Sequence, residues 1–389
     1  MNLEENVRGK HILILEGYAR QCLPFMREFK KLGCEISLLC HSRLDCGYAS
    51  RFPDHKILGV CDPDMYSESE KCIVELVKTG LYDFVFPLVD FSAGILAHHK
   101  AELSKYAIIL SNDSEVFDRS QDKLEVMKVC SENGIPCPLT LTDVSTVDEV
   151  LASGIKFPII IKPRRGCGAR GFHKFENEDE FRTYTAQNKT DISGMVVQEC
   201  LPIESLVMSD NIFIDSSGEV KSSFLYGCYR VYPIKGGTGT FNITFNREEI
   251  HRQCAVLVKK MGLRGCVGVD LMIDARDDTA KVIEINPRVL ACAKIGFISG
   301  VNQARQVLED AVGLPVTPCM SYKTDMRVRM SQTDVLWFLK SPDRFRAKPS
   351  WFSQKNTKDQ IFSVDDPLPW FAFLLRGLKN LKKEEDKRK

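Results

Sequence analysis

The sequence lacks several patterns that mark common functional classes. No Gly-x-Gly-x-x-Gly motif follows the first predicted strand, so a dinucleotide site is not expected there. The signature Gly-x-x-x-x-Gly-Lys-Ser/Thr is absent, which excludes a Walker A loop. No apolar run approaches the ~20 residues that a membrane-spanning helix needs. The opening segment MNLEENVRGK is acidic and has no apolar core, so we expect no signal peptide.

An excess of one charge is also missing. The chain carries 53 basic and 52 acidic residues, a net charge of +1, which gives no general reason to expect a nucleic-acid partner. Cysteine is plentiful at 15, but the number is odd, no Cys-x-x-Cys pair occurs, and the seven histidines include no His-x-x-x-His pair. A disulfide framework is usually even in number and confined to a small secreted domain. We therefore expect the cysteines to be small buried hydrophobes of a reduced, cytoplasmic protein.

The spacing of apolar segments predicts an α/β protein. At 389 residues the chain is too long for one ordinary core, so two or three domains are expected. Over residues 1–114 short apolar strands alternate with helical spacing, which predicts a doubly wound parallel sheet. The expected strands are HILIL (11–15), CEISLLC (34–40), KILGV (56–60), DFVFPLV (83–89) and AIIL (107–110), with helices at 19–32 and 67–79 among them.

The pattern changes after residue 114. A helix capped by Ser120 leads into a smaller α/β segment, and mainly antiparallel strands follow over 206–286. The expected helices are 120–133, 177–187, 247–261 and 302–312, and the expected strands of the smaller segment are 158–163 and 195–199. Residues 320–389 are rich in Trp and Phe and end in a charged tail.

The stretch KVIEINPRVL places an acid and an amide inside an apolar strand. Alternation puts Val282, Glu284 and Asn286 on one face. Upstream, GVDLMID reads as the partner strand of a hairpin that pairs Asp270 with Glu284. Two opposed carboxylates repel each other, and a divalent cation with oxygen ligands removes that penalty. A solvated hairpin face is the alternative, but the apolar surroundings favour burial and a metal site.

A basic strand end precedes a glycine-rich loop in FPIIIKPRRGCGARGFHKF. Lys162 ends the strand, and Gly166, Gly168 and Gly171 follow. Glycines let backbone N–H groups approach phosphate oxygens, and the lysine supplies a point charge. Taken alone, the pattern fits a surface hairpin with a solvated lysine at least as well.

Taken in order, these motifs resemble the ATP-grasp superfamily. SQDKLEVMKVCSENGIPCP, FPIIIKP, GCGARG, VVQECLPIE and GVDLMID…VIEINPR follow the family's order over about residues 10–315. Within the family the chain is most similar to one half of the carbamoyl-phosphate synthetase large subunit and to single-chain carboxylate–amine ligases. It holds one such unit and no glutaminase-like segment, so carbamoyl-phosphate synthesis is not expected.

The resemblance implies a nucleotide site. Lys123 and Lys162 would contact the ATP phosphates beneath a mobile loop. The carbonyl of Glu199 and the N–H of Leu201 would face adenine, with Glu204 on the ribose hydroxyls. Without the family context, Glu199 and Glu204 are equally consistent with charged surface residues. Lys123 would then be an ordinary lysine on the face of a helix. The implied nucleotide-binding residues are Lys123, Lys162, Gly166, Gly168, Gly171, Glu199, Leu201 and Glu204.

The resemblance also implies the metal ligands and a catalytic pair. Asp270, Glu284 and Asn286 would hold one or two Mg²⁺ ions, with Mn²⁺ able to substitute. Arg288, acting with Lys162, would stabilise charge on the transferring phosphoryl group, a task suited to a planar fork donor. An ion pair with a neighbouring acid is the alternative for Arg288.

The implied enzyme is an ATP-dependent ligase that joins a small carboxylate to an amine through an acylphosphate. A carboxylase or phosphotransferase on another acceptor, and a non-catalytic nucleotide-binding regulator, are the alternatives. In CYRVYPIKGGTGTFN, Arg230 and Lys235 are predicted to bind the anionic substrate.

The expected organisation has three parts. Residues 1–114 form a Rossmann-like domain, 115–318 a two-lobed ATP-grasp domain with a mobile lid at about 127–200, and 319–389 a small extension. The sequence is compatible with a homodimer but does not predict the oligomeric state. The tail DPLPWFAFLLRGLKNLKKEEDKRK is amphipathic, and we favour a helix packed on the domain over interfacial membrane docking.

Overall fold

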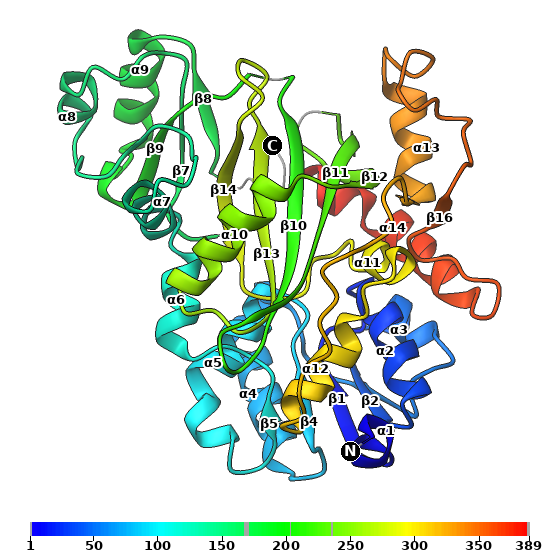
Figure 1. The fold of residues 1–389 in the computed structure, drawn as a ribbon. Helices are drawn as coiled ribbons and strands as arrows, with labels where there is room; N and C mark the ends of the chain where they lie inside the picture. The colour runs from blue at the N-terminus through cyan, green and yellow to red at the C-terminus, as the bar shows by residue number, and fades with distance from the viewer. Residues whose placement is uncertain (1, 167–170, 203, 235, 387–389) are drawn as a thin grey trace.

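Three β-sheets organise the chain (Figure 1). The computed structural model describes residues 2–166, 171–202, 204–234 and 236–386. The N-terminal sheet is parallel throughout, with strand order β3–β2–β1–β4–β5, which confirms the predicted doubly wound sheet. Its strands are β1 (His11–Ile14), β2 (Glu35–Cys40), β3 (His55–Leu58), β4 (Phe84–Phe86) and β5 (Ile108–Ile109).

Both faces of this sheet are covered, which explains its continuous apolar strands. In β1, Ile12 and Ile14 join one core cluster, while Leu13 and Leu15 face the other. The associated helices are α1 (Leu3–Val7), α2 (Cys22–Lys31), α3 (Cys46–Ala49), the short 3₁₀ turn Pro63–Met65, α4 (Tyr66–Lys78), α5 (Asp90–Leu103) and α6 (Ser114–Gln121).

The predicted helix at 120–133 is shorter than expected. It begins after Asp122, whose side chain accepts a hydrogen bond from the Leu124 N–H, and runs as α7 over Lys123–Glu132. Ser120 belongs instead to α6, where its hydroxyl donates to the Phe117 carbonyl. Aspartate and serine are both good caps, so composition alone did not separate them.

A four-stranded antiparallel sheet, ordered β6–β9–β7–β8, forms the upper left lobe in Figure 1. The predicted strands at 158–163 and 195–199 are confirmed as β7 and β9. The elements of this lobe are β6 (Thr140–Leu141), α8 (Val147–Ala152), β7 (Ile159–Pro163), β8 (His173–Phe175), α9 (Glu178–Asn188), the 3₁₀ turn Ile192–Gly194 and β9 (Met195–Glu199).

The largest sheet has seven strands in the order β14–β13–β10–β11–β12–β15–β16, antiparallel except for its last pair. Its last two strands lie beyond residue 318, so the C-terminal segment extends it; the predicted domain boundaries stay predictions. The elements are β10 (Leu206–Ile214), β11 (Val220–Tyr232), β12 (Thr238–Phe245), α10 (Glu248–Lys260), β13 (Gly265–Ile273), β14 (Ala280–Asn286), α11 (Lys294–Ser299), α12 (Gln303–Ala311), β15 (Arg327–Arg329), α13 (Ser331–Lys340), β16 (Thr357–Asp359) and α14 (Leu368–Asp386).

One core joins the N-terminal sheet to the seven-stranded sheet. Phe213 of β10 and Leu308 of α12 belong to the same buried cluster as Ile14 of β1. Trp370 and Phe373 of α14 pack against this cluster, which confirms the favoured placement of the tail helix on the domain. Every cysteine within the described ranges is a free thiol. None of the described helices is long and apolar enough to cross a membrane.

Candidate functional site

A pocket of about 290 Å³ opens between the four-stranded sheet and strands β13 and β14. Apolar side chains line one part of the pocket, called the apolar slot below, and charged side chains line the other part. The apolar lining includes Ile160, Phe172, Leu201, Met272 and Ile283. Lys123, Lys162, Gly166, Glu199 and Glu284 also line the pocket, so five of the predicted nucleotide and metal residues meet there together with Leu201.

Two lysines and an acid form the charged end. Lys162, at the end of β7, is only 8% exposed. The pKa of Lys162 is lowered to about 8, chiefly by burial and in smaller part by the nearby Lys123 charge, while the Glu284 carboxylate opposes the shift. The Nζ of Lys123 lies 3.6 Å from Glu284 and donates to the Gly166 carbonyl at 2.6 Å. Anionic oxygens entering this end would find two cations and one carboxylate.

The glycine-rich loop begins at this end. Gly166 lines the pocket with φ 120°, a conformation that side-chain-bearing residues rarely adopt. Gly171 has φ 70°, and a Cβ there would lie 2.9 Å from the Pro163 ring, so its place in the loop also requires glycine. The predicted Gly168 lies outside the described residues.

Asp270 and Glu284 face each other across the β13–β14 pair, as the sequence predicted. Burial and the Glu284 charge raise the pKa of Asp270 to about 6. Hydrogen bonds from Ser209 Oγ at 2.5 Å and Asn286 Nδ2 at 2.9 Å, and the Arg288 charge, oppose that rise. Two carboxylates and one amide therefore gather on adjacent strands, an all-oxygen donor set that fits Mg²⁺.

The predicted alternation of β14 is wrong at one position. The register shifts by one residue after the Asp270–Glu284 pair, so Leu271 faces Val282 rather than Ile283. Val282 therefore joins Ile285 in the core, while Ile283 lines the pocket beside Glu284. A bulge of this kind aims two successive side chains at one site, and period-2 reasoning does not detect it.

Arg288 is fixed by an acid at the start of helix α5, which follows β4 of the N-terminal sheet. Its guanidinium binds Asp90 through Nε–Oδ1 at 3.1 Å and Nη2–Oδ2 at 2.8 Å, and Nη2 also donates to Asn286 Oδ1 at 2.9 Å. Burial disfavours the charged guanidinium, but Asp90 outweighs it and raises the pKa of Arg288. Asp90 was missed from the sequence, although its position after a strand of a parallel sheet is where ligand-site residues gather.

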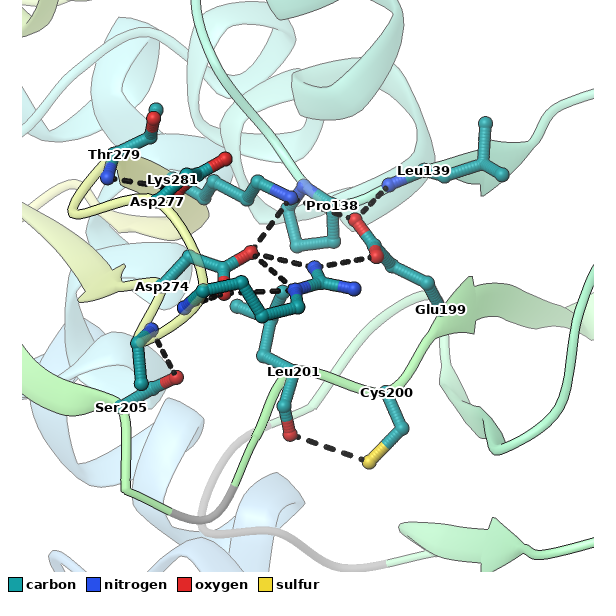
Figure 2. Close-up of polar contacts among 12 residues, drawn as sticks. Pro138, Leu139, Glu199, Cys200, Leu201, Ser205, Asp274, Asp277, Thr279 and Lys281 are labelled. Carbon is teal, nitrogen blue, oxygen red and sulfur yellow. Dashed lines mark hydrogen bonds and ion pairs between the residues drawn. The ribbon is translucent and has the colours of Figure 1, made fainter.

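At the opposite end of the pocket, Glu199 is held by two cations (Figure 2). Its carboxylate binds Lys281 Nζ at 2.8 Å and Arg276 Nη2 at 2.7 Å, and accepts from the Leu139 N–H at 3.0 Å. Burial would raise the pKa of Glu199, but Lys281 and the other donors lower it. Asp274 binds the same two cations. Sequence reasoning selected Glu199 for its backbone carbonyl but missed the charged side chains around it, because they come from a separate strand end.

Two predicted residues lie away from the pocket, and a third is not among the described residues. Glu204 is exposed in a turn and does not line the pocket. Arg230 is buried, and its charge is balanced by Asp334 through Nε–Oδ1 at 2.7 Å and Nη2–Oδ2 at 3.0 Å. Its guanidinium also stacks 3.7 Å from the centre of the Phe241 ring. Lys235 lies outside the described residues. The structure thus gives Arg230 an internal partner in place of the predicted anionic substrate.

Comparison with known proteins agrees with this geometry. Residues 120–292 match a family model described as an ATP-grasp domain. The D-aspartate ligase of Enterococcus faecium (strain Aus0004) is 27% identical over 246 residues, which is 57% of this chain and 57% of that protein. The match therefore spans little more than half the length of this curated relative.

Solved structures show the same fold. The biotin carboxylase of Campylobacter jejuni, in a beta-gamma-ATP complex, has a TM-score of 0.69 at 18% identity, covering 81% of this chain and 74% of that one. The biotin carboxylase domain dimer of Hydrogenobacter thermophilus 2-oxoglutarate carboxylase, with MgADP and bicarbonate, has a TM-score of 0.68 at 16% identity, covering 81% and 73%. The resemblance that the ordered motifs predicted is confirmed: residues 120–292 match the ATP-grasp domain model, and the solved structures share the fold.

Proposed function

We propose that the protein is an ATP-dependent ligase that joins a carboxylate to an amine and releases ADP and phosphate. The observation that carries this proposal is the placement of Lys162, Lys123 and the Asp270–Glu284 pair at one end of a pocket whose other end is an apolar slot. The adenine ring fits the slot, and the triphosphate fits the charged end. The matched D-aspartate ligase bears the name of an enzyme of this class.

The proposed reaction needs no protein nucleophile. A carboxylate oxygen attacks the γ-phosphorus of ATP, the bond to the β-phosphate oxygen breaks, and ADP leaves with that electron pair. The amine nitrogen then attacks the acylphosphate carbonyl, loses a proton, and expels phosphate. Positioning and electrostatic stabilisation are sufficient for such a sequence.

Each site residue takes one part of this work. Lys123 and Lys162 neutralise phosphate oxygens, and Gly166, which lines the pocket with them, lets the backbone approach those oxygens. Asp270, Glu284 and Asn286 would hold Mg²⁺, which supplies charge neutralisation at the β- and γ-phosphates when bound; one or two ions, and Mn²⁺ as a substitute, belong to the same proposal. Arg288, held by Asp90, points its charge at the transferring phosphoryl group.

The proposal also includes contacts with the adenine ring and the ribose of ATP. The Glu199 carbonyl and the Leu201 N–H would read adenine, and Glu204 would reach the ribose. Substrates are small acids and amines. The dimer described for the Hydrogenobacter thermophilus domain makes a homodimer part of the proposal.

A turnover screen tests this function. The full chain is incubated with Mg·ATP and a matrix of small acids and amines while ADP and phosphate are measured. We expect ADP only where both partners are present, and we expect hydroxylamine to replace the amine by trapping the acylphosphate as a hydroxamate. Lys162→Met should abolish turnover, whereas Lys174→Met, an exposed lysine of the same lobe, should not.

The outcomes separate the alternatives. Phosphate transferred to a product rather than released identifies a phosphotransferase, and ADP formed with bicarbonate identifies a carboxylase. Binding of Mg·ATP without turnover across the whole matrix identifies a regulator. Each of these three results contradicts the ligase.

A further inference from the structure

Arg20 occupies the turn that leaves the carboxyl end of β1. In the order β3–β2–β1–β4–β5, the chain builds outward from β1 on one side and from β4 on the other. Ligands of open α/β sheets bind in the crevice outside the strand ends at such a reversal. Asp90, which binds Arg288, begins the helix after β4 at the same reversal. Arg20 therefore lies in the crevice that adjoins the acidic end of the nucleotide pocket.

The charge of Arg20 has no counter-ion within the part of the chain that the structure describes. Its guanidinium makes no hydrogen bond or ion pair with any described residue, and its Nε is buried without a partner. The groups that interact with it electrostatically are the thiols of Cys292 and Cys46 and the phenol of Tyr226, which are uncharged at neutral pH. By contrast, Arg288 and Arg376, which border the same crevice, each hold an aspartate.

A short line of polar residues connects Arg20 to the predicted metal ligands. Tyr226 of β11 lies opposite Ser209 of β10, and Ser209 lies opposite Asp270 of β13. Two strand spacings, about 10 Å, separate Tyr226 from Asp270. A small organic molecule with one end at the γ-phosphate of ATP would reach this arginine with its other end.

Arg20 is partly buried, and its buried Nε has no partner, so holding this charge is costly and an anion that binds there offsets the cost. In the proposed function, Lys123 and Lys162, which line the pocket with Glu284, already neutralise the nucleotide phosphates. Arg20 is therefore not needed for the phosphates. Carboxylate matches the planar fork of arginine through two parallel hydrogen bonds. The ligand that fits the position is therefore a carboxylate that belongs to the acceptor and does not react.

We infer that Arg20 binds a second carboxylate of the substrate, so that the enzyme selects acids or amino acids bearing an anionic group in addition to the reacting one. Tyr226 and Cys292 form the neutral walls of this subsite. The inference rests on the proposed ligase function and deepens it, because it names the substrate class.

Binding and turnover of one probe pair test this inference. Aspartate and its α-carboxamide differ only in the second carboxylate. Affinity of the full chain for each is measured by calorimetry in the presence of magnesium and a non-hydrolysable ATP analogue, and ADP release is measured with ATP and hydroxylamine. For the wild type we expect aspartate to bind at least about tenfold more tightly than the carboxamide. Arg20→Met should remove that preference and leave nucleotide affinity unchanged, and Arg20→Lys should keep part of it.

A stability measurement separates this role from a structural one. Because Arg20 loses no hydrogen bond or ion pair to any of the described residues, Arg20→Met should unfold at the same or a higher temperature than the wild type. Arg43→Met, an exposed arginine in the loop after the neighbouring strand β2, is the matched control and should change neither stability nor preference. If Arg20→Met does not fold, the inference is wrong, because Arg20 then has a structural role.

Failure of the inference differs from failure of the proposed function. Equal affinity of the wild type for aspartate and its carboxamide, or an unchanged preference in Arg20→Met, overturns the subsite. An Arg20-dependent preference without any ADP release supports the subsite and overturns the ligase.

Discussion

Arg288 and Asp90 form a two-point ion pair that joins the end of β14 to the first turn of α5, with Nη2 and Oδ2 at 2.8 Å. The two residues are 198 positions apart in the sequence. Because Arg288 also donates to Asn286, the pair sets both the orientation of the guanidinium and that of a predicted metal ligand. The segment that follows β4 of the N-terminal sheet thus contributes directly to the geometry of the proposed phosphoryl-transfer site.

This pairing makes Asp90 a positioning residue. Asp90→Asn keeps the shape of the side chain but weakens its hold on Arg288, so we expect kcat to fall about tenfold and the KM for ATP to stay within about twofold. Arg288→Met should lower kcat by on the order of a hundredfold or more. The double variant should be no worse than Arg288→Met alone, since Asp90 acts through Arg288.

Asp83→Asn is the matched control, because Asp83 pairs with Lys10 at the opposite end of the same sheet. Its kcat should equal that of the wild type. Additive losses in the double variant would contradict the coupling.

Glu16 should make the protein less stable as the pH rises. It is fully buried in the turn after β1, and burial raises its pKa to about 7 from 4.5, with Asp90 adding repulsion and hydrogen bonds from Ser92 and the Leu88 N–H opposing. Because the folded pKa is the higher one, the stabilising effect of the proton is complete below pH 4.5 and is lost as the pH rises to 7. The loss from this group is on the order of 3 kcal/mol at most.

Glu16→Gln removes that dependence. The free energy of unfolding, measured by urea titration at pH 5 and pH 8, should change less between the two pH values in Glu16→Gln than in the wild type. Glu5→Gln, an exposed acid of α1, should follow the wild type. An identical pH slope in Glu16→Gln would show that the carboxylate is charged throughout this range.

Sequence reasoning succeeded where local pattern and structure coincide. The Asp270–Glu284 pairing followed from hairpin symmetry, and Lys162 followed from its place at a strand end. It failed where the partner is distant in the chain. Asp334 lies 104 residues from Arg230, so nothing near CYRVYPIKGG indicates that this arginine is already neutralised. The bulge in β14 was missed for another reason: a one-residue register shift leaves no mark in an apolar sequence.

Arg230 should therefore contribute to stability. Its partner Asp334 is fully buried and also binds Arg329 and Thr240 Oγ1, so Arg230→Met leaves a buried carboxylate with fewer donors. We expect a loss of about 3–5 kcal/mol in the free energy of unfolding. Arg247→Met, which breaks an exposed pair with Asp278, should cost less than about 1 kcal/mol. A higher KM for an anionic substrate at unchanged stability would instead support the substrate-binding role predicted from the sequence.

The cluster around Glu199 predicts a separate effect on nucleotide binding. Lys281 holds both Glu199 and Asp274, so Lys281→Met should remove one of the two cations on Glu199 and loosen the strand end whose backbone borders the apolar slot. The result should be a KM for ATP raised several-fold with kcat nearly unchanged, because the phosphate end is untouched. Lys259→Met, which removes an exposed pair with Glu219, is the control and should leave both constants alone. A fall in kcat at constant KM for ATP would mean that the cluster acts on the chemical step rather than on purine binding.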